Sequence, residues 1–235
     1  MRYFLDSHVK EDPRLLDVYV EAKRCYAEMD LYQHNFHHVI RDLYRGLMIA
    51  ASEEPVKYTV LIPSILLHDI GFSDPGFKTE GHDVMGARIA SKILRSFGFD
   101  EPTCHAVCHC VRSHKGKAEL PQTIEAKILY DADVLEKAGA VALIHGGKII
   151  CEFGQTLDEY LRKEIEDRKR EIARGFYTAK AREIDNGSIE KCLDLLLEAQ
   201  EETRRTRPDF GVSEKDLWAN KESVPEESAL PLLPV

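Results

Sequence analysis

The residues best suited to chemistry are His68 and Asp69, which end a segment, residues 59–69, that is otherwise largely apolar. A carboxylate buried there without a partner would be costly. A divalent cation bound by both side chains would remove that cost, whereas a helix end that faces water would avoid it. Gly71 follows and permits a sharp exit from the segment. The pair therefore predicts a metal site or an exposed helix end.

A second polar segment, residues 33–39, contains His34 and His38. Residues four apart share one face of a helix, and Arg41 and Asp42 would lie one turn further along the same predicted helix. A solvated polar face gives the same pattern. This segment alone leaves a ligand pair and a surface pair open.

Two aspartates, Asp131 and Asp133, interrupt the apolar segment 121–137. Residues two apart lie on nearly opposite sides of a helix, so at most one of them can face a shared site. The other is expected to cap a turn or to support a ligand. His82 and His114 are two further candidates, and each on its own is equally compatible with a surface histidine.

Helical periodicity runs through nearly the whole chain and predicts an all-α fold. Helices are expected at residues 13–30, 33–51, 59–69, 79–96, 101–113, 121–137, 138–145, 156–174 and 178–205. The helix 138–145 is expected to stop at the pair Gly146 and Gly147, and the last helix to break near 186–187. Thr156 and Glu159 form a capping-box pattern. The sequence thus predicts one helical domain, residues 1–205, and an irregular tail, residues 206–235.

Taken in order, these segments resemble the HD-domain superfamily of metal-dependent phosphohydrolases over about residues 30–185. The resemblance rests on the segments 38–41, 66–71 and 132–135, with Gly139 and Ala140 at a common family spacing. It implies a single-domain helical bundle of the HD-domain and phosphodiesterase type. It also implies the metal ligands His38, His68, Asp69 and Asp133, and so selects Asp133 over Asp131.

The resemblance implies further roles around those ligands. His82 and His114 resemble histidines of the two-metal members, where they would bind a second ion or the substrate phosphate, and Asp69 would then bridge the two ions. His34 matches the phosphodiesterase histidine that protonates the leaving group. Arg41 is expected to contact phosphate or to pair with a nearby acid as scaffold. No Gly-Tyr-Pro follows His114, so a cyclic dinucleotide substrate is not supported.

The expected cofactor is one divalent ion or two. A mixed set of imidazole and carboxylate ligands suits Mn²⁺, Fe²⁺, Co²⁺, Ni²⁺ or Zn²⁺ better than Mg²⁺. The expected activity is hydrolysis of a phosphate ester or anhydride on a small molecule, most simply a nucleotide. Three alternatives remain open: a nucleoside triphosphate pyrophosphohydrolase, a non-catalytic HD-fold ligand-binding module, and a di-iron HD oxygenase.

Charge and composition narrow the partners. The chain of 235 residues carries 41 acidic and 32 basic residues, a formal net charge of −9. Nucleic-acid polymers and anionic membranes attract clustered positive charge, so neither is expected as a partner. The sequence contains no apolar run long enough for a membrane span and no signal-like start, and its six cysteines fit a reducing compartment. We therefore expect a cytoplasmic protein with a small phosphorylated substrate, and a homodimer is left open.

Overall fold

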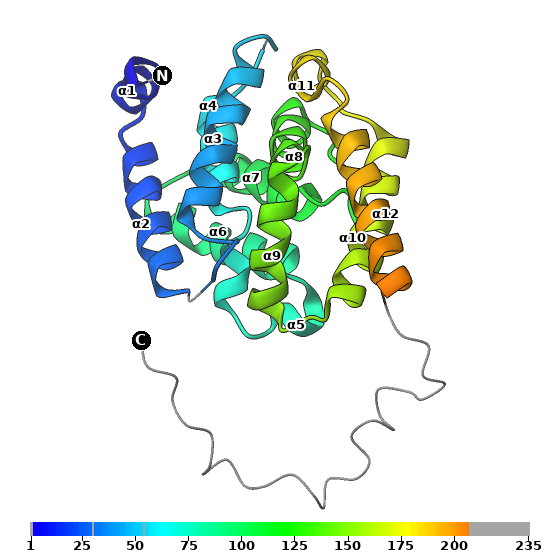
Figure 1. The fold of residues 1–235 in the computed structure, drawn as a ribbon. Helices are drawn as coiled ribbons and strands as arrows, with labels where there is room; N and C mark the ends of the chain where they lie inside the picture. The colour runs from blue at the N-terminus through cyan, green and yellow to red at the C-terminus, as the bar shows by residue number, and fades with distance from the viewer. Residues whose placement is uncertain (1, 30, 54, 207–235) are drawn as a thin grey trace, which may run out of the picture.

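The fold is all-α, as the sequence predicts (Figure 1). The structure, a computed structural model, describes residues 2–29, 31–53 and 55–206. Over these residues the elements are α1 (Arg2–Glu11), α2 (Arg14–Glu28), α3 (Phe36–Ala50), α4 (Tyr58–Leu67), the 3-10 helix η1 (Ile70–Ser73), α5 (Phe77–Glu80), α6 (His82–Ser96), α7 (Glu101–Ser113), α8 (Ile124–Glu136), α9 (Val141–Phe153), α10 (Leu157–Arg174), α11 (Ala179–Asp185) and α12 (Ser188–Thr206).

Helix α4 forms the centre of the main core. All of its residues from Val60 to Leu67 are buried, which explains why its sequence is apolar on every side. It packs against α2, α3, α7 and α8. Because α4 ends inside the molecule, the residues that follow it, His68 and Asp69, are 0% and 3% exposed. An exposed helix end at this point is therefore excluded.

Helix α3 begins later than the predicted helix 33–51. Asn35 is its N-cap, and its side chain accepts hydrogen bonds from the backbone N–H groups of His37 and His38. Because of this cap, the helix starts at Phe36, and His34 lies in the preceding loop. The expectation that His34 and His38 share a helix face is therefore wrong, because the capping side chain at Asn35 overrides the helical spacing.

Two glycines shape the region after α4. Gly81, with φ 93°, divides the predicted helix 79–96 into α5 and α6, so that His82 is the first residue of α6. Gly71 has no positive φ, and a glycine is needed there because the backbone packs closely against α6. A Cβ atom there would overlap the carbonyl oxygen of His82 and come within 2.5 Å of the Gly86 nitrogen. Gly71 thus lets η1 touch α6.

Helix α9 does not stop at Gly146 and Gly147, as the sequence predicted, but continues to Phe153 and ends at Gly154, which adopts the left-handed conformation with φ 59°. Gly146 is buried, and a Cβ atom there would overlap the hydroxyl group of Tyr160 on α10. A packing requirement, and not a helix stop, therefore accounts for this glycine.

Of the last three helices, α11 packs against α8 and the main core, whereas α10 and α12 pack against each other. The predicted capping box is present at the start of α10, between Thr156 and Glu159. Asn186, with φ 45°, gives the predicted break between α11 and α12. Helices α10 and α12 lie side by side, away from α1 and α2 (Figure 1). They share a small second core with α9, made of Ala142, Tyr160, Leu161, Ile165, Cys192 and Leu196.

The remaining differences from the predictions lie at element ends. Helix α1 is present where no helix was predicted. Helix α8 begins at Ile124 rather than near Pro121, because the side chain of Thr123 caps it by accepting from the N–H of Ala126. The predicted C-terminal tail lies, beyond Thr206, outside the described residues. None of the described helices is both long and apolar enough to cross a bilayer.

Candidate metal centre

Three segments bring histidine and aspartate side chains to one buried point. The Nε2 atom of His38, on α3, lies 3.3 Å from Nε2 of His68, at the end of α4. Oδ2 of Asp69 lies 3.4 Å from the first of these atoms and 3.3 Å from the second. Oδ1 of Asp133, on α8, lies 3.9 Å from Nε2 of His38. The structure thus brings all four predicted ligands together.

A second group adjoins the first. Oδ1 of Asp69 lies 3.3 Å from Nε2 of His82 and 3.5 Å from Nε2 of His114, and the two imidazole nitrogens are 3.2 Å apart. Gly71 makes this possible, because the contact between η1 and α6 carries His82 to within reach of Asp69. Each oxygen of the Asp69 carboxylate therefore faces a different pair of histidines.

Two of the histidines are oriented by the helices that they follow. Nδ1 of His68 lies 2.8 Å from the carbonyl oxygen of Ile65, and Nδ1 of His114 lies 2.6 Å from that of Val111. A carbonyl oxygen only accepts, so each Nδ1 must donate its proton. In the neutral imidazole this leaves Nε2 unprotonated and facing the centre, which is the form that binds metals.

The sequence did not single out Asp42 as a ligand, although it lies one turn after His38. Its side chain is fully buried, and Oδ2 lies 3.2 Å from Nε2 of His38 and 3.8 Å from Nε2 of His68. Oδ2 has no hydrogen-bond partner. The four-residue spacing from His38 could have indicated that Asp42 faces the same site. The neighbouring Arg41 instead suggested that Asp42 forms an ion pair at the surface.

Burial and mutual charge set the protonation of the centre. Burial raises the pKa of Asp42 to about 7. Burial also opposes ionisation of Asp69, but His68, His114 and His38 hold the pKa of that carboxyl well below its usual range. Burial lowers the pKa of His82 well below the usual value, so this imidazole is neutral. Burial opposes the charge of His38 and His68 as well, but the carboxylates of Asp42 and Asp69 raise the pKa of these imidazoles. A buried cluster whose carboxylates draw positive charge in this way favours a cation.

The donor set fits a divalent ion. The described residues include two groups whose ligand atoms all lie within 4.8 Å of one another: His38, Asp42, His68 and Asp133, and then Asp69, His82 and His114. Metal bonds of about 2.0–2.2 Å place adjacent donors roughly 3 Å apart. The separations above are close to that value, and the unpartnered oxygen of Asp42 needs a positive neighbour. The buried cluster is therefore able to hold a metal.

Arg41 does not face the centre. Its guanidinium pairs with Glu136 through Nε at 2.6 Å, and Arg45 pairs with the same carboxylate. The Oε1 atom of Glu136 lies 3.7 Å from Nδ1 of His38. Glu136 and the two arginines therefore lie on the side of the His38 ring that faces away from the metal centre. The two arginines together with His38 lower the pKa of Glu136 to about 2 against the effect of its burial. This geometry favours the scaffold alternative for Arg41, with Glu136 as the partner acid.

His34 lies at the edge of the site, held by a residue that the sequence did not indicate. Its Nδ1 is hydrogen-bonded to Glu152, on α9. The other oxygen of Glu152 accepts the backbone N–H of Gln33 at 2.7 Å and that of His34 at 3.2 Å. The Glu152 side chain is fully buried. The carboxylate thus fixes both the loop and the imidazole ring.

The second aspartate of the α8 pair, Asp131, supports the chain elsewhere, as expected. Its carboxylate accepts hydrogen bonds from the backbone N–H groups of Tyr177 and Thr178 and from the Thr178 hydroxyl. Burial raises its pKa to about 6. Asp131 therefore secures the turn before α11, and Asp133 alone of the two reaches the centre.

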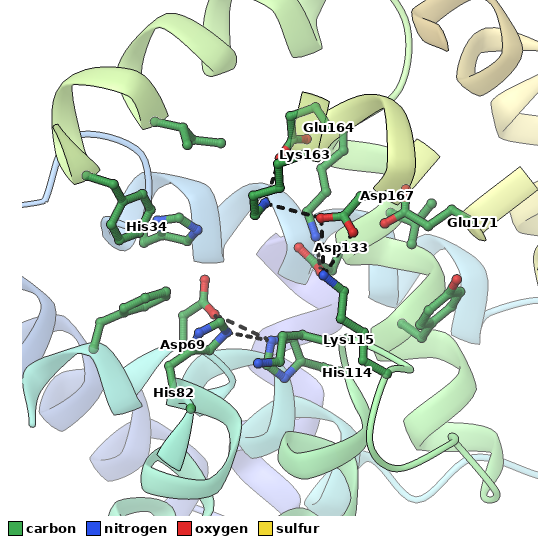
Figure 2. A pocket seen from close by; sticks show the side chains of 18 of the residues that line it. His34, Asp69, His82, His114, Lys115, Asp133, Lys163, Glu164, Asp167 and Glu171 are labelled. Atoms are coloured by element: carbon green, nitrogen blue, oxygen red, sulfur yellow. Dashed lines mark hydrogen bonds and ion pairs between the residues drawn. The ribbon is translucent and has the colours of Figure 1, made fainter. Parts of the chain in front are cut away.

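A cavity of about 380 Å³ opens onto the centre. Asp69, His82, His114 and Asp133 line its floor, and His34 lines its rim. One face of α10 forms the opposite wall, with Lys163, Glu164, Asp167, Arg168 and Glu171. Figure 2 shows Asp69, His82 and His114 on one side of the cavity and Lys163, Glu164, Asp167 and Glu171 on the other.

Basic side chains come close to the floor of the cavity. Nζ of Lys137, one turn after Asp133, lies 2.5 Å from Oδ2 of that carboxylate. Burial works against the charge of Lys137, but Asp133 raises its pKa above the usual value. Nζ of Lys115 lies 2.5 Å from Asp83. Helix α10 also supplies Lys163 and Arg168 to the wall.

Part of the chain is similar in sequence to known proteins. Residues 35–138 match the family model described as HD domain. A bifunctional uridylyltransferase/uridylyl-removing enzyme of Ruegeria pomeroyi is 35% identical over 83 residues, which are 34% of this chain and 9% of that protein. The chain thus matches less than a tenth of the length of this curated relative.

Solved structures share the fold across most of the chain. A "predicted HD superfamily hydrolase" from an uncultured Thermotogales bacterium is 24% identical, with a TM-score of 0.52, and the match covers 81% of this chain and 92% of that one. Bacillus subtilis YpgQ, in complex with ADP, is 18% identical with a TM-score of 0.59, covering 85% and 98%. The solved structures thus show a shared fold over most of the chain, and the match to the HD-domain family model covers residues 35–138.

Proposed function

We propose that this protein is a metal-dependent phosphohydrolase that cleaves a phosphate ester or anhydride of a nucleotide. The observation that carries the proposal is the position of Asp69. Its two oxygens lie 3.3–3.5 Å from two separate pairs of histidines, so one carboxylate is shared by two ligand groups at the floor of a cavity. That is the arrangement by which a two-metal site would bind a phosphoryl group.

Each group around the centre then has a task. Bound divalent ions would polarise the phosphoryl group and activate a water molecule for in-line attack. Lys137 and Lys163, at the floor and wall of the cavity, would contact the remaining negative oxygens of the substrate. His34, when both ring nitrogens are protonated and Nδ1–H is bonded to Glu152, would donate the Nε2 proton to the leaving oxygen and become the neutral imidazole.

Three observations support a nucleotide as the substrate. The cavity of about 380 Å³ is within the range for small-molecule sites, about 300–1,000 Å³. YpgQ, which shares this fold, was solved in complex with ADP. Phe72 and Phe153 also line the cavity and offer flat apolar faces on which a base could stack.

A screen of nucleoside mono-, di- and triphosphates tests the proposal, with Mn²⁺, Co²⁺, Ni²⁺, Zn²⁺ or Mg²⁺ added to protein that was first treated with a chelator. Released phosphate and released pyrophosphate are measured separately, because pyrophosphate would identify a triphosphate pyrophosphohydrolase. We expect activity only with added metal, and more with the transition metals than with Mg²⁺.

The matched variants are Asp69→Asn and Asp185→Asn. Asp185 is also a buried aspartate, but it caps the start of α12 by accepting from the N–H groups of Gly187 and Ile189. We expect the first variant to lose turnover by roughly 10³-fold or more, because it removes an interaction needed in the transition state. The second should retain turnover. Equal turnover of Asp69→Asn and the wild type would refute the proposal.

A further inference from the structure

The two ligand groups of the centre differ in their access to the cavity. His38, Asp42 and His68 are 2%, 0% and 0% exposed. Of the described residues, the cavity lining includes Asp69, His82, His114 and Asp133 but none of these three. The first group therefore reaches the cavity only through Asp133 and the shared Asp69, whereas every member of the second group lines the space that a substrate would enter.

We propose that Asp42 is an additional ligand that closes the inner ion site, so that the substrate phosphate and the attacking water bind at the outer site of Asp69, His82 and His114. The inner site comprises His38, Asp42, His68 and Asp133, with Asp69 shared. The proposal rests on the two-metal centre of the proposed function and divides that centre into a retaining site and a reacting site.

The case for Asp42 as a ligand rests on its surroundings. Oδ2 points to the same two Nε2 atoms that face Asp69 and has no hydrogen-bond partner. Arg45 contacts only Oδ1, at 3.4 Å, so the two imidazoles are the charged or polar groups closest to Oδ2. A fully buried carboxylate oxygen in this state is costly, and a cation between it and the imidazoles removes the cost.

The number of donors at each site decides where the reacting groups can bind. With Asp42, the inner site has five donor residues, which would leave an octahedral ion there a single open position. The outer site has three donor residues, so half of the positions of such an ion would remain free. All three outer donors line the cavity, together with Lys163 and His34. Tight retention is therefore expected of the inner ion and exchange of the outer one.

Metal release tests this division without any substrate. The full-length protein, freed of metal and reloaded with Zn²⁺, is mixed with excess of a chromogenic chelator, and released zinc is followed over time. We expect two kinetic classes of ion of about equal amount. Inorganic phosphate should slow only the faster class, because it binds only to an ion that faces the cavity. A single class, or slowing of both classes by phosphate, would overturn the proposal.

Variants then assign each class to its residues. Asp42→Asn should speed release of the slow class by roughly 100-fold or more, since even residues that only support a ligand contribute about 10–100-fold to affinity. His114→Gln should remove the fast class and leave the slow one. Asp185→Asn, which removes a buried carboxylate elsewhere, should change neither. Release of the slow ion from Asp42→Asn at the wild-type rate would exclude Asp42 as a ligand.

A second measurement covers the case in which Asp42→Asn does not fold. The wild-type protein with one equivalent of Co²⁺ should show the weak visible absorption of a five- or six-coordinate ion. The intense absorption of a tetrahedral ion would contradict a closed five-donor site. None of these readouts depends on turnover. Two classes of ion without phosphohydrolase activity would therefore leave this inference standing while the proposed function failed.

Discussion

At the scale of single residues, the centre uses one local device twice. His68 and His114 are the C-cap residues of α4 and α7, and each donates its Nδ1 proton to the carbonyl oxygen three residues earlier. The last carbonyls of a helix lack intrahelical partners, so the bond stabilises the helix end as well. One hydrogen bond thus both satisfies the backbone and orients Nε2.

Glu152 gives the first prediction at this scale. Replacing Glu152 by Gln removes the charge that holds the His34 ring, and general acid catalysis of this kind contributes about 10²–10⁴-fold. We expect kcat for a nucleotide to fall by up to ~10²-fold. With p-nitrophenyl phosphate, whose leaving group needs no proton, kcat should be almost unchanged. Steady-state kinetics with both substrates measures the contrast.

The controls separate positioning from general damage. His34→Gln should show the same contrast between substrates as Glu152→Gln, whereas His37→Gln should show none, since His37 is exposed in the next turn. Equal loss on both substrates in Glu152→Gln, at unchanged metal content, would show that Glu152 serves only to hold the loop.

A residue of the site could be predicted from the sequence where neighbouring residues in the chain mark it as unusual. His68, Asp69 and Asp133 stand out because each interrupts an apolar helix, and all three reach the centre. His34 also reaches it, but its helical placement was wrong because the cap at Asn35 was not weighed. Glu152 could not be predicted, since its contact with His34 spans 118 residues and leaves no pattern along the chain.

At the scale of elements, the contact of η1 with α6 brings the outer group together, and Gly71 tests it. Alanine there would place a Cβ atom on the carbonyl oxygen of His82, and overpacking of this kind costs about 1–3 kcal/mol. We expect urea denaturation to show a loss of that size. Metal release should lose the fast class first. An unaltered fast class in Gly71→Ala would mean that the contact does not position His82.

Helix α9 provides a matched pair of substitutions. Gly146→Ala should destabilise the protein by about 1–3 kcal/mol, because the methyl group would meet the Tyr160 hydroxyl. A Cβ atom at Gly147 has nothing within 4 Å, so Gly147→Ala should stabilise it by up to about 1 kcal/mol through helix propensity. The free energy of unfolding of both variants, measured by urea denaturation, tests this contrast. Similar values for the two variants would contradict the packing role of Gly146.

Element types were predictable and element ends were not. The apolar segment 59–69 and the capping box at Thr156 each carry a local signal, and both gave the right helix. The pair Gly146 and Gly147 carries the usual signal of a helix stop, but the close approach of α10 is a tertiary requirement that no local pattern expresses. The same holds for Gly71, whose role depends on the close approach of α6.

At the scale of the whole molecule, the centre joins α3, α4, α6, α7 and α8 at one point, so metal binding and global stability are coupled. Ion present at about 100 times its Kd stabilises the folded state by about 2.7 kcal/mol. For a chain of this size that corresponds to a rise in Tm of about 5–10 °C. Thermal unfolding followed by circular dichroism, with EDTA or with Mn²⁺, measures it. Asp69→Asn should show a much smaller rise, and a wild-type Tm that does not respond to metal would contradict the coupling.

The wall of the cavity has a consequence for how this protein could diversify. The five wall residues on α10 lie beyond residues 35–138, the part that matches the HD domain, while every donor of the two ligand groups lies within it. The metal donors and this wall of the cavity are thus encoded in consecutive stretches of the chain. Substitutions along a single amphipathic helix could therefore reshape that wall and leave every donor residue unchanged.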